Sequence, residues 1–124
     1  MDYVPGDLRG DGGGLIHLAP WVAVDRNRYA VVRRGRPPVP LTALEWRVLA
    51  VLMKHQGHVV SSEQLIAAGW IGEPRAPQDL YVVISRLRQL LERRPHHPEL
   101  LVTRRGFGYL LQPVGHARPW PFKF

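Results

Sequence analysis

The sequence predicts an α+β fold in which an N-terminal antiparallel β-sheet precedes three helices and a C-terminal β-hairpin. Apolar and polar residues alternate over residues 15–41, as in half-buried strands, and residues 100–111 are typical of a β-hairpin with glycines near its reversal. Between these stretches, apolar residues recur at helical spacing in three segments. We expect a single domain over residues 15–112, because 124 residues are too few for two ordinary domains.

The two ends of the chain differ in composition from this predicted domain. Residues 1–14 contain three aspartates and five glycines, which is typical of a flexible segment or linker. Residues 113–124 form a proline-rich tail with Trp120, Phe122 and Phe124. These aromatic residues either pack back on the sheet, are presented to a partner, or derive from cloning.

Residues 15–41 are expected to form the sheet. Residues 25–27 (Asp-Arg-Asn) and 34–35 (Arg-Gly) are typical of turns between short strands. Pro20 and the prolines at 37–38 cannot donate to a strand ladder, so we place them at edges or turns.

Two short helices should follow, each opened by a capping box. Thr42 is followed three residues later by Glu45, and Ser61 by Gln64. Gly57 lies where the first helix should end, and the second should reach Gly69 or Trp70. The loop 71–77 comes next, where we expect Pro74 and Pro77 to prevent helix continuation.

The third predicted helix, residues 78–93, has one apolar stripe and one polar face. The stripe consists of Leu80, Val83, Ile84, Leu87, Leu90 and Leu91. The polar face carries Gln78, Val82, Ser85, Arg86, Gln89 and Arg93, flanked by Tyr81 and Arg88.

Residues 100–111 close the domain as a hairpin, with Gly106 and Gly108 near its reversal. Two short helices, a longer one and an arginine-tipped hairpin are the layout of a winged helix-turn-helix.

The charge is strongly basic. The net charge is +7, and 15 of the 17 cationic residues are arginine. Such a surface attracts polyanions, of which nucleic acid is the commonest in a cytoplasm. Solubility and the arginine usage of a GC-rich genome are alternative reasons for the same composition.

Several classes of protein lack support in the sequence. The absence of cysteine excludes disulfides and thiolate metal sites, and no apolar run is long enough to cross a membrane. We find no catalytic motif, so we expect neither an enzyme nor a cofactor. His96 and His97 have no third metal ligand at a recognisable spacing, which favours a solvated loop over a metal site. A soluble cytoplasmic protein is the default expectation.

The ordered segments LTALEWRVLAVL, GHVVSSEQLI, GW, VVISRLRQLLE and TRRGFGYLL resemble the DNA-binding (effector) domain of the OmpR/PhoB family of bacterial response regulators. The resemblance spans residues 41–111, and the strands from about Leu15 fit the family's N-terminal sheet. The family's phosphorylated receiver domain has no counterpart in these 124 residues. We therefore expect either a stand-alone DNA-binding protein or the C-terminal part of a longer one.

The resemblance implies that helix 78–93 lies in the major groove of double-stranded DNA and wing 100–111 in the minor groove. The residues that it places at bases are Val82, Ser85, Arg86 and Gln89. Those that it places at the DNA backbone are Trp70, Gln78, Arg88, Thr103 and Tyr109. It also implies a tandem dimer on direct repeats and RNA polymerase contact through loop 71–77.

The residue types fit these roles on physical grounds. The planar fork of Arg86 matches the guanine edge, and Val82 suits a thymine methyl group. A narrow minor groove concentrates negative potential and attracts arginine, which suggests a target for Arg104 and Arg105. Because neighbouring residues on a strand point in opposite directions, we favour Arg105 for the groove and Arg104 for a side role.

The polar face of the third helix also departs from the family pattern. Gln78 and Asp79 replace basic or hydroxyl residues, and Ser85 stands where arginine is frequent. This leaves three hypotheses open: a nucleoid-associated, sequence-specific regulator; a protein-interaction module that docks on RNA polymerase or another regulator; and a nonspecific nucleoid protein. We favour the first of these.

Overall fold

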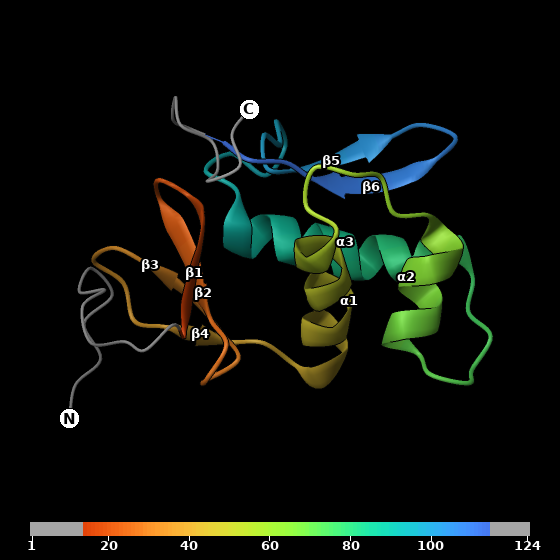
Figure 1. Cartoon of the computed structure of the whole chain (residues 1–124), viewed down its shortest axis with the longest axis horizontal. Helices are drawn as coiled ribbons and strands as arrows, with labels where there is room; N and C mark the ends of the chain where they lie inside the picture. The colour runs from red at the N-terminus through yellow and green to blue at the C-terminus, as the bar shows by residue number, and fades with distance from the viewer. Residues whose placement is uncertain (1–13, 115–124) are drawn as a thin grey trace.

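The strands and helices follow the predicted order along the chain (Figure 1). The computed structural model describes residues 14–114, so the predictions for residues 1–13 and 115–124 lie outside the described residues. Within the described range, the elements are β1 Leu15–Ala19, β2 Val22–Asp25, β3 Ala30–Arg33, β4 Val39–Pro40, α1 Ala43–Lys54, α2 Ser62–Gly69, α3 Pro77–Leu91, β5 Leu101–Arg104 and β6 Gly108–Leu111. The predicted α+β fold is confirmed.

The N-terminal sheet is antiparallel, with strand order β1-β2-β3-β4. The turn between β2 and β3 is fixed by Asp25, whose carboxylate accepts hydrogen bonds from the backbone N–H groups of Asn27 (2.9 Å) and Arg28 (3.2 Å). The same carboxylate pairs with the Arg28 guanidinium at 3.1 Å. These partners compensate for the burial of the Asp25 charge, which is only 1% exposed.

Both predicted capping boxes are present. The backbone N–H of Glu45 donates to Thr42 Oγ1 (3.1 Å), and Glu45 Oε1 accepts from the Thr42 backbone N–H (2.9 Å). Ser61 and Gln64 make the equivalent pair of bonds at the start of α2, each at 3.1 Å. The two helices therefore begin at the positions that the sequence predicts.

The predicted bounds of the third helix, 78–93, are wrong at both ends. Pro77 is the first helical residue. Proline is tolerated there because the first N–H groups of a helix have no carbonyl partner within the helix, so the N–H that proline lacks is not missed. At the other end the helix stops at Leu91, and Glu92 has extended backbone angles (φ −87°, ψ 149°). Arg93 lies beyond the helix, where its guanidinium stacks 4.2 Å from the centroid of the Trp21 ring and pairs with Glu99 at 2.8 Å.

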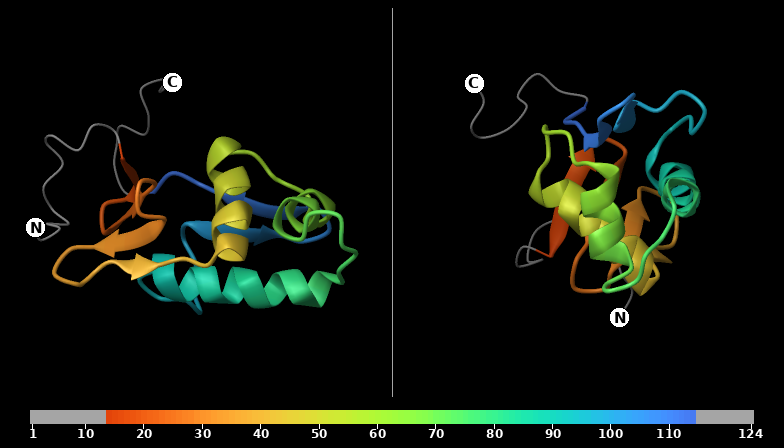
Figure 2. Two further views of the ribbon diagram at one scale, coloured as in Figure 1. Left: turned by 90° about the horizontal axis from the view of Figure 1, so that it is seen from below. Right: turned by 90° about the vertical axis from the view of Figure 1, so that its right-hand side faces the viewer.

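The core lies where α1, α2 and α3 meet the hairpin and the sheet. Figure 2 shows α1 standing across α3, with the β5–β6 hairpin along one side and the sheet at the C-terminal end of α3. All six residues of the predicted apolar stripe of α3 are buried. Other core members are Leu18, Val24, Val31, Val48, Leu49, Leu52, Val60, Leu65, Leu100, Leu101 and Leu111.

The C-terminal end of α3 joins the sheet to the hairpin. The last carbonyl groups of the helix accept hydrogen bonds from two side chains of the sheet region: Trp21 Nε1 donates to Leu91 O at 2.7 Å, and Arg33 donates to Leu90 O at 3.0 Å. Arg33 also donates to Glu92 O at 3.3 Å. These bonds satisfy carbonyl groups that have no partner within the helix itself.

The Glu92 side chain turns the other way and fixes the start of the hairpin. It is only 2% exposed, and its carboxylate accepts from the backbone N–H groups of Glu99 (2.8 Å), Leu100 (3.0 Å) and Leu101 (2.7 Å). One residue therefore connects the end of α3 to the first residue of β5.

We predict that Glu92→Ala lowers the free energy of unfolding by about 3 kcal/mol, because it leaves buried backbone N–H groups without a partner. Urea denaturation followed by circular dichroism measures the change. Glu63→Ala is the matched control, since Glu63 is exposed and should change stability by no more than about 0.5 kcal/mol. Equal stability of the two variants would contradict the role assigned to Glu92.

Candidate nucleic-acid interface

One face of α3 remains open to solvent while the opposite face fills the core. Gln78, Val82 and Gln89 are exposed on it, and Ser85 is half-buried. Val82 is 67% exposed, so this apolar side chain contributes little to the core. The helix thus presents short polar groups around an isolated methyl-bearing side chain.

Asp79 has a local role that the sequence analysis did not assign. Its Oδ2 accepts a hydrogen bond from the backbone N–H of Ala76 at 3.0 Å, at the start of α3. A carboxylate in the first turn also interacts favourably with the helix dipole. Asp79 therefore stabilises the start of α3.

Arg86 lies on the flank of the exposed face, next to the first turn of α1. Its Nε is 3.6 Å from Glu45 Oε2, and its side chain is 46% exposed. Among the described residues, Glu45 is its ion-pair partner. The Arg86 side chain thus lies beside α1 while nearly half of its surface stays open to solvent.

The hairpin β5–β6 carries the predicted wing arginines at its tip. Arg104 pairs with Gly108 in the strand register, and Phe107 N donates to Arg104 O at 2.8 Å across the reversal. Arg104 and Arg105 are both exposed. Phe107, between the two glycines, is 71% exposed, and the sequence analysis did not single it out.

The hairpin is fastened to α3 by Arg88. Arg88 Nε donates to Leu101 O at 2.9 Å, and Arg88 Nη2 donates to Thr103 Oγ1 at 2.8 Å. The guanidinium also lies 5.9 Å from the centroid of the Tyr109 ring. Arg88 is 9% exposed and largely occupied within the protein, so its contact with DNA phosphate stays a prediction.

Burial raises the pKa of the Tyr109 hydroxyl; nearby Arg88 opposes this effect, and Tyr81 adds to it. The phenol therefore stays protonated at neutral pH and can act as a hydrogen-bond donor. Only this protonated phenol can donate a hydrogen bond to a phosphate oxygen.

The hairpin is also joined to the segment before α2. Val60 N donates to Tyr109 O at 2.8 Å, Tyr109 N donates to Val60 O at 3.0 Å, and Gly57 N donates to Leu111 O at 2.8 Å. Gly108 has φ +147°, and a Cβ atom there would overlap the carbonyl oxygen of Val60. Glycine is therefore required where the wing crosses this segment.

Trp70 and the loop after it form the far end of the candidate interface. Trp70 follows the last residue of α2 and is half-buried, with the Arg75 guanidinium 5.7 Å from the centroid of its ring. In loop 71–77, Arg75 pairs with Glu73 at 2.9 Å, and Ile71 is 71% exposed.

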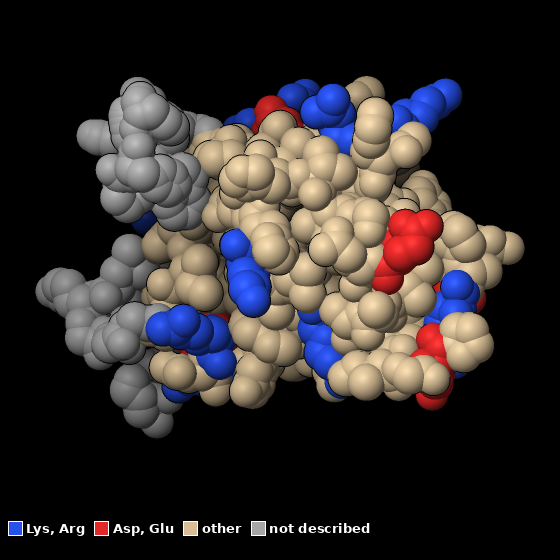
Figure 3. Space-filling model, turned by 45° about the vertical axis from the view of Figure 1, so that its right-hand side comes forward, with Lys and Arg blue, Asp and Glu red and all other residues tan. Residues whose placement is uncertain are grey.

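Charge is distributed unevenly over this surface. In Figure 3, Lys and Arg side chains stand along the upper edge, at the height of the β5–β6 hairpin, with acidic atoms among them, while both basic and acidic side chains lie lower on the same face. Arg104, the last residue of β5, and Arg105 are exposed at the end of this hairpin. This distribution favours contact of the wing with a polyanion.

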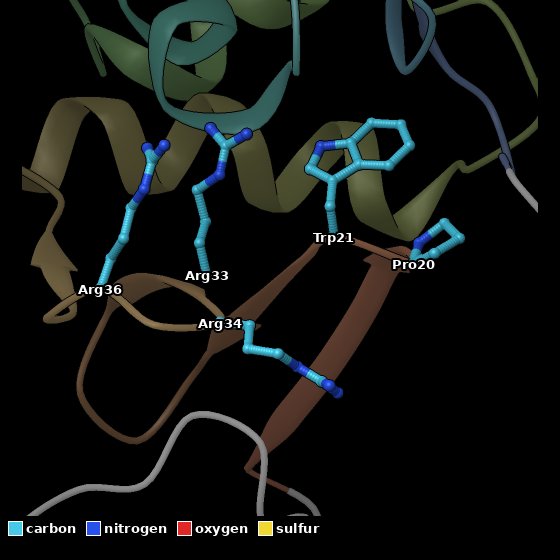
Figure 4. A pocket seen from close by; sticks show the side chains of 5 residues that line it. All are labelled: Pro20, Trp21, Arg33, Arg34 and Arg36. Carbon is cyan, nitrogen blue, oxygen red and sulfur yellow. The ribbon is translucent and has the colours of Figure 1, made fainter.

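A second basic region lies at the sheet. A pocket is lined by Pro20, Trp21, Arg33, Arg34 and Arg36. Figure 4 shows Arg33, Arg36 and Trp21 pointing to one side and Arg34 to the other. Burial lowers the pKa of Arg33 and the charge of Arg36 lowers it further, while Glu92 raises it. Because Arg33 is bound to the end of α3, it serves the fold.

The described residues contain no group of three or more His, Asp or Glu side chains placed to hold a metal ion. His96 and His97 are both exposed. Within residues 14–114, no helix has the length and apolar character needed to cross a membrane.

Comparison with known proteins identifies the family. The family model "Transcriptional regulatory protein, C terminal" matches residues 35–111, and the chain belongs to this family. More specifically, the fold and the structural relatives are those of OmpR/PhoB-type DNA-binding domains.

Three solved structures illustrate the similarity. The OmpR/PhoB homologue DrrB of Thermotoga maritima is 28% identical, with a TM-score of 0.70 over 80% of this chain and 44% of its own. The DNA-binding domain of CpxR from E. coli is also 28% identical, with a TM-score of 0.62, and the match covers 79% of this chain and 95% of that domain. The RstA DNA-binding domain of Klebsiella pneumoniae, solved in complex with the RstA box, is 25% identical, with a TM-score of 0.64 over 79% of this chain and 96% of that one. This chain thus spans less than half of DrrB.

We predict that Gly108→Ala destabilises the domain by about 3 kcal/mol, because the added methyl group must displace the Val60 backbone. Gly106→Ala is the matched control: it also has positive φ (+85°) but open space around it, so only backbone strain of about 1 kcal/mol is expected. Thermal unfolding measures both. A cost for Gly108→Ala no larger than that for Gly106→Ala would contradict the close packing of the wing.

Proposed function

We propose that this domain binds double-stranded DNA with sequence specificity as a bacterial transcriptional regulator, with α3 in the major groove and the β5–β6 wing in the adjacent minor groove. The observation that carries the proposal is the exposed face of α3 beside an arginine-tipped hairpin. Arg88 and Thr103 join the two elements at 2.8 Å, so they can dock as one unit. The solved complex of the RstA relative with the RstA box supports the binding of DNA by this domain.

The exposed face of α3 supplies the base contacts. Arg86 suits the O6 and N7 acceptors of guanine, and Gln89 suits the edge of adenine. Val82 offers methyl groups to thymine, and the Ser85 hydroxyl can donate or accept. Val82, Arg86 and Gln89 are exposed on this side of the helix and Ser85 is half-buried between them, which supports these assignments.

The wing and its surroundings supply minor-groove and phosphate contacts. Arg105 enters the minor groove and Arg104 lies at its side, where both positive charges release counterions from the duplex. Trp70, Gln78, Thr103 and Tyr109 contact the sugar-phosphate backbone, together with whatever part of Arg88 remains accessible. These contacts fix the position of the protein along the duplex, but they do not distinguish one base from another.

In the proposed mode of binding, two copies of the domain occupy neighbouring direct repeats as a tandem pair. A single domain of this size covers few base pairs, so one copy alone binds weakly. Loop 71–77 contacts RNA polymerase, a role supported by the exposed Ile71. The domain would then work at the nucleoid in the cytoplasm.

The second candidate function is a protein-interaction module that docks on polymerase or another regulator. Exposed Ile71 and Phe107 favour it, since large exposed apolar side chains suit protein contacts. The exposed Arg86, Arg104 and Arg105 favour DNA instead. Binding to DNA at low salt separates the two candidates.

We predict that Arg86→Ala reduces discrimination between the preferred duplex and one altered at a contacted guanine by roughly 10- to 100-fold, because the bidentate contact is lost. Weak binding to both duplexes should remain through phosphate contacts. Fluorescence anisotropy with the two duplexes measures the ratio. Unchanged discrimination would remove Arg86 from base readout.

We predict that Arg105→Ala weakens binding to every duplex and makes the slope of log affinity against log salt less steep by about 1, since one cation fewer displaces counterions. Arg34→Ala is the matched control, because Arg34 is also exposed but lies beside the sheet. If both variants lost affinity equally, the wing would have no special role in binding.

Selection from a pool of random duplexes, followed by sequencing, is the first experiment to perform. Enrichment of a repeated motif with half-sites about one helical turn apart would support the tandem mode. Binding without enrichment would favour a nonspecific nucleoid protein. Failure to bind at low salt would favour the protein-interaction module, with RNA polymerase as the next partner to test.

A further inference from the structure

Glu45 has a second contact besides its capping box. One carboxylate oxygen, Oε1, accepts from the Thr42 backbone N–H at 2.9 Å, and the other, Oε2, faces Arg86 Nε at 3.6 Å. A residue at the start of α1 is therefore in contact with the proposed base-reading arginine of α3. The sequence pattern explains only the first of these contacts.

We propose that Glu45 is a specificity-determining residue, which positions Arg86 for the major groove. This inference rests on the proposed function of the domain. The carboxylate holds the guanidinium at its Nε edge, which leaves the two terminal nitrogens to face a base.

The position of the Glu45 carboxylate is itself fixed. Its Oε1 accepts from the Thr42 backbone N–H at 2.9 Å, so the side chain is tied to the helix start, while the Glu45 backbone N–H separately donates to Thr42 Oγ1 at 3.1 Å. It is only 13% exposed. A carboxylate held in this way can orient a flexible partner without moving toward it.

Arg86 needs such orientation because its side chain is long and half-exposed. A free arginine loses much rotamer entropy when a base immobilises it, and a partner that restricts it beforehand reduces that loss. The separation of 3.6 Å is longer than a hydrogen bond of good geometry, so the contact is chiefly an ionic attraction.

The contact with Glu45 is compatible with base readout. Guanine needs two N–H groups on one edge of the guanidinium, and the edge formed by the two terminal nitrogens suffices. Arg86 does not have to release Glu45 to use it. A carboxylate that merely competed with DNA would instead have to be displaced.

Glu45→Gln tests the proposal while keeping the helix cap. Glutamine is accepted at this position of a capping box, as Gln64 shows at the start of α2 in the same chain. The substitution removes the negative charge that faces Arg86. The wild-type chain of 124 residues, Glu45→Gln, Arg86→Ala and the double variant are compared on the preferred duplex and on one altered at the guanine.

We expect Glu45→Gln to lower the discrimination ratio by about fivefold, a fraction of the effect of removing the arginine itself. In the Arg86→Ala background, Glu45→Gln should leave that ratio unchanged, since the residue that it positions is gone. Thr42→Ala controls for helix stability: it removes the hydroxyl cap, keeps the carboxylate and should retain discrimination. Glu63→Gln controls for charge, and should raise affinity for both duplexes alike if it has any effect.

Three outcomes would overturn the inference. If wild type discriminates and Glu45→Gln discriminates equally well, Glu45 does not position Arg86. If Glu45→Gln tightens binding to the preferred duplex with no loss of discrimination, the carboxylate competes with DNA. If wild type binds all duplexes equally, the proposed function fails, and this inference fails with it.

Discussion

The C-terminal end of α3 is the point on which the arrangement of the other elements depends. Trp21 and Arg33 of the sheet region bind its last carbonyl groups, and the buried Glu92 carboxylate binds the backbone N–H groups that lead into β5. A helix end and a buried carboxylate both require partners, because unpaired polar groups in the interior are costly. Meeting these two requirements at one place sets the positions of the sheet and the hairpin relative to α3.

A few hydrogen bonds also join the elements of the candidate interface. The hairpin is held against α3 by Arg88 and against the segment before α2 by Val60, so the hairpin and α3 are joined into one surface. Because the hairpin and α3 are already joined before a ligand binds, less conformational entropy is lost on binding. Arg104 and Arg105 are exposed at the tip of the hairpin, beyond these contacts.

Local features of this fold could be predicted from the sequence, and long-range ones could not. The capping boxes and the apolar stripe of α3 depend on residues three or four apart, which a sequence displays directly. The end of α3 was misplaced because Glu92 is drawn out of the helix by backbone groups seven to nine residues further on. Likewise, Arg88 was assigned to phosphate by resemblance, whereas its bonds to Leu101 and Thr103 depend on tertiary placement. The pairing of Glu45 with Arg86 was missed for the same reason.

The link between Trp21 and Leu91 also has a consequence for synthesis on the ribosome. These partners are 70 residues apart in the chain. At typical translation rates Trp21 emerges about 4 to 14 s before Leu91 does. During this interval the carbonyl group of Leu91 is not available to Trp21, so this link between the sheet and α3 forms only after α1 and α2 have also emerged.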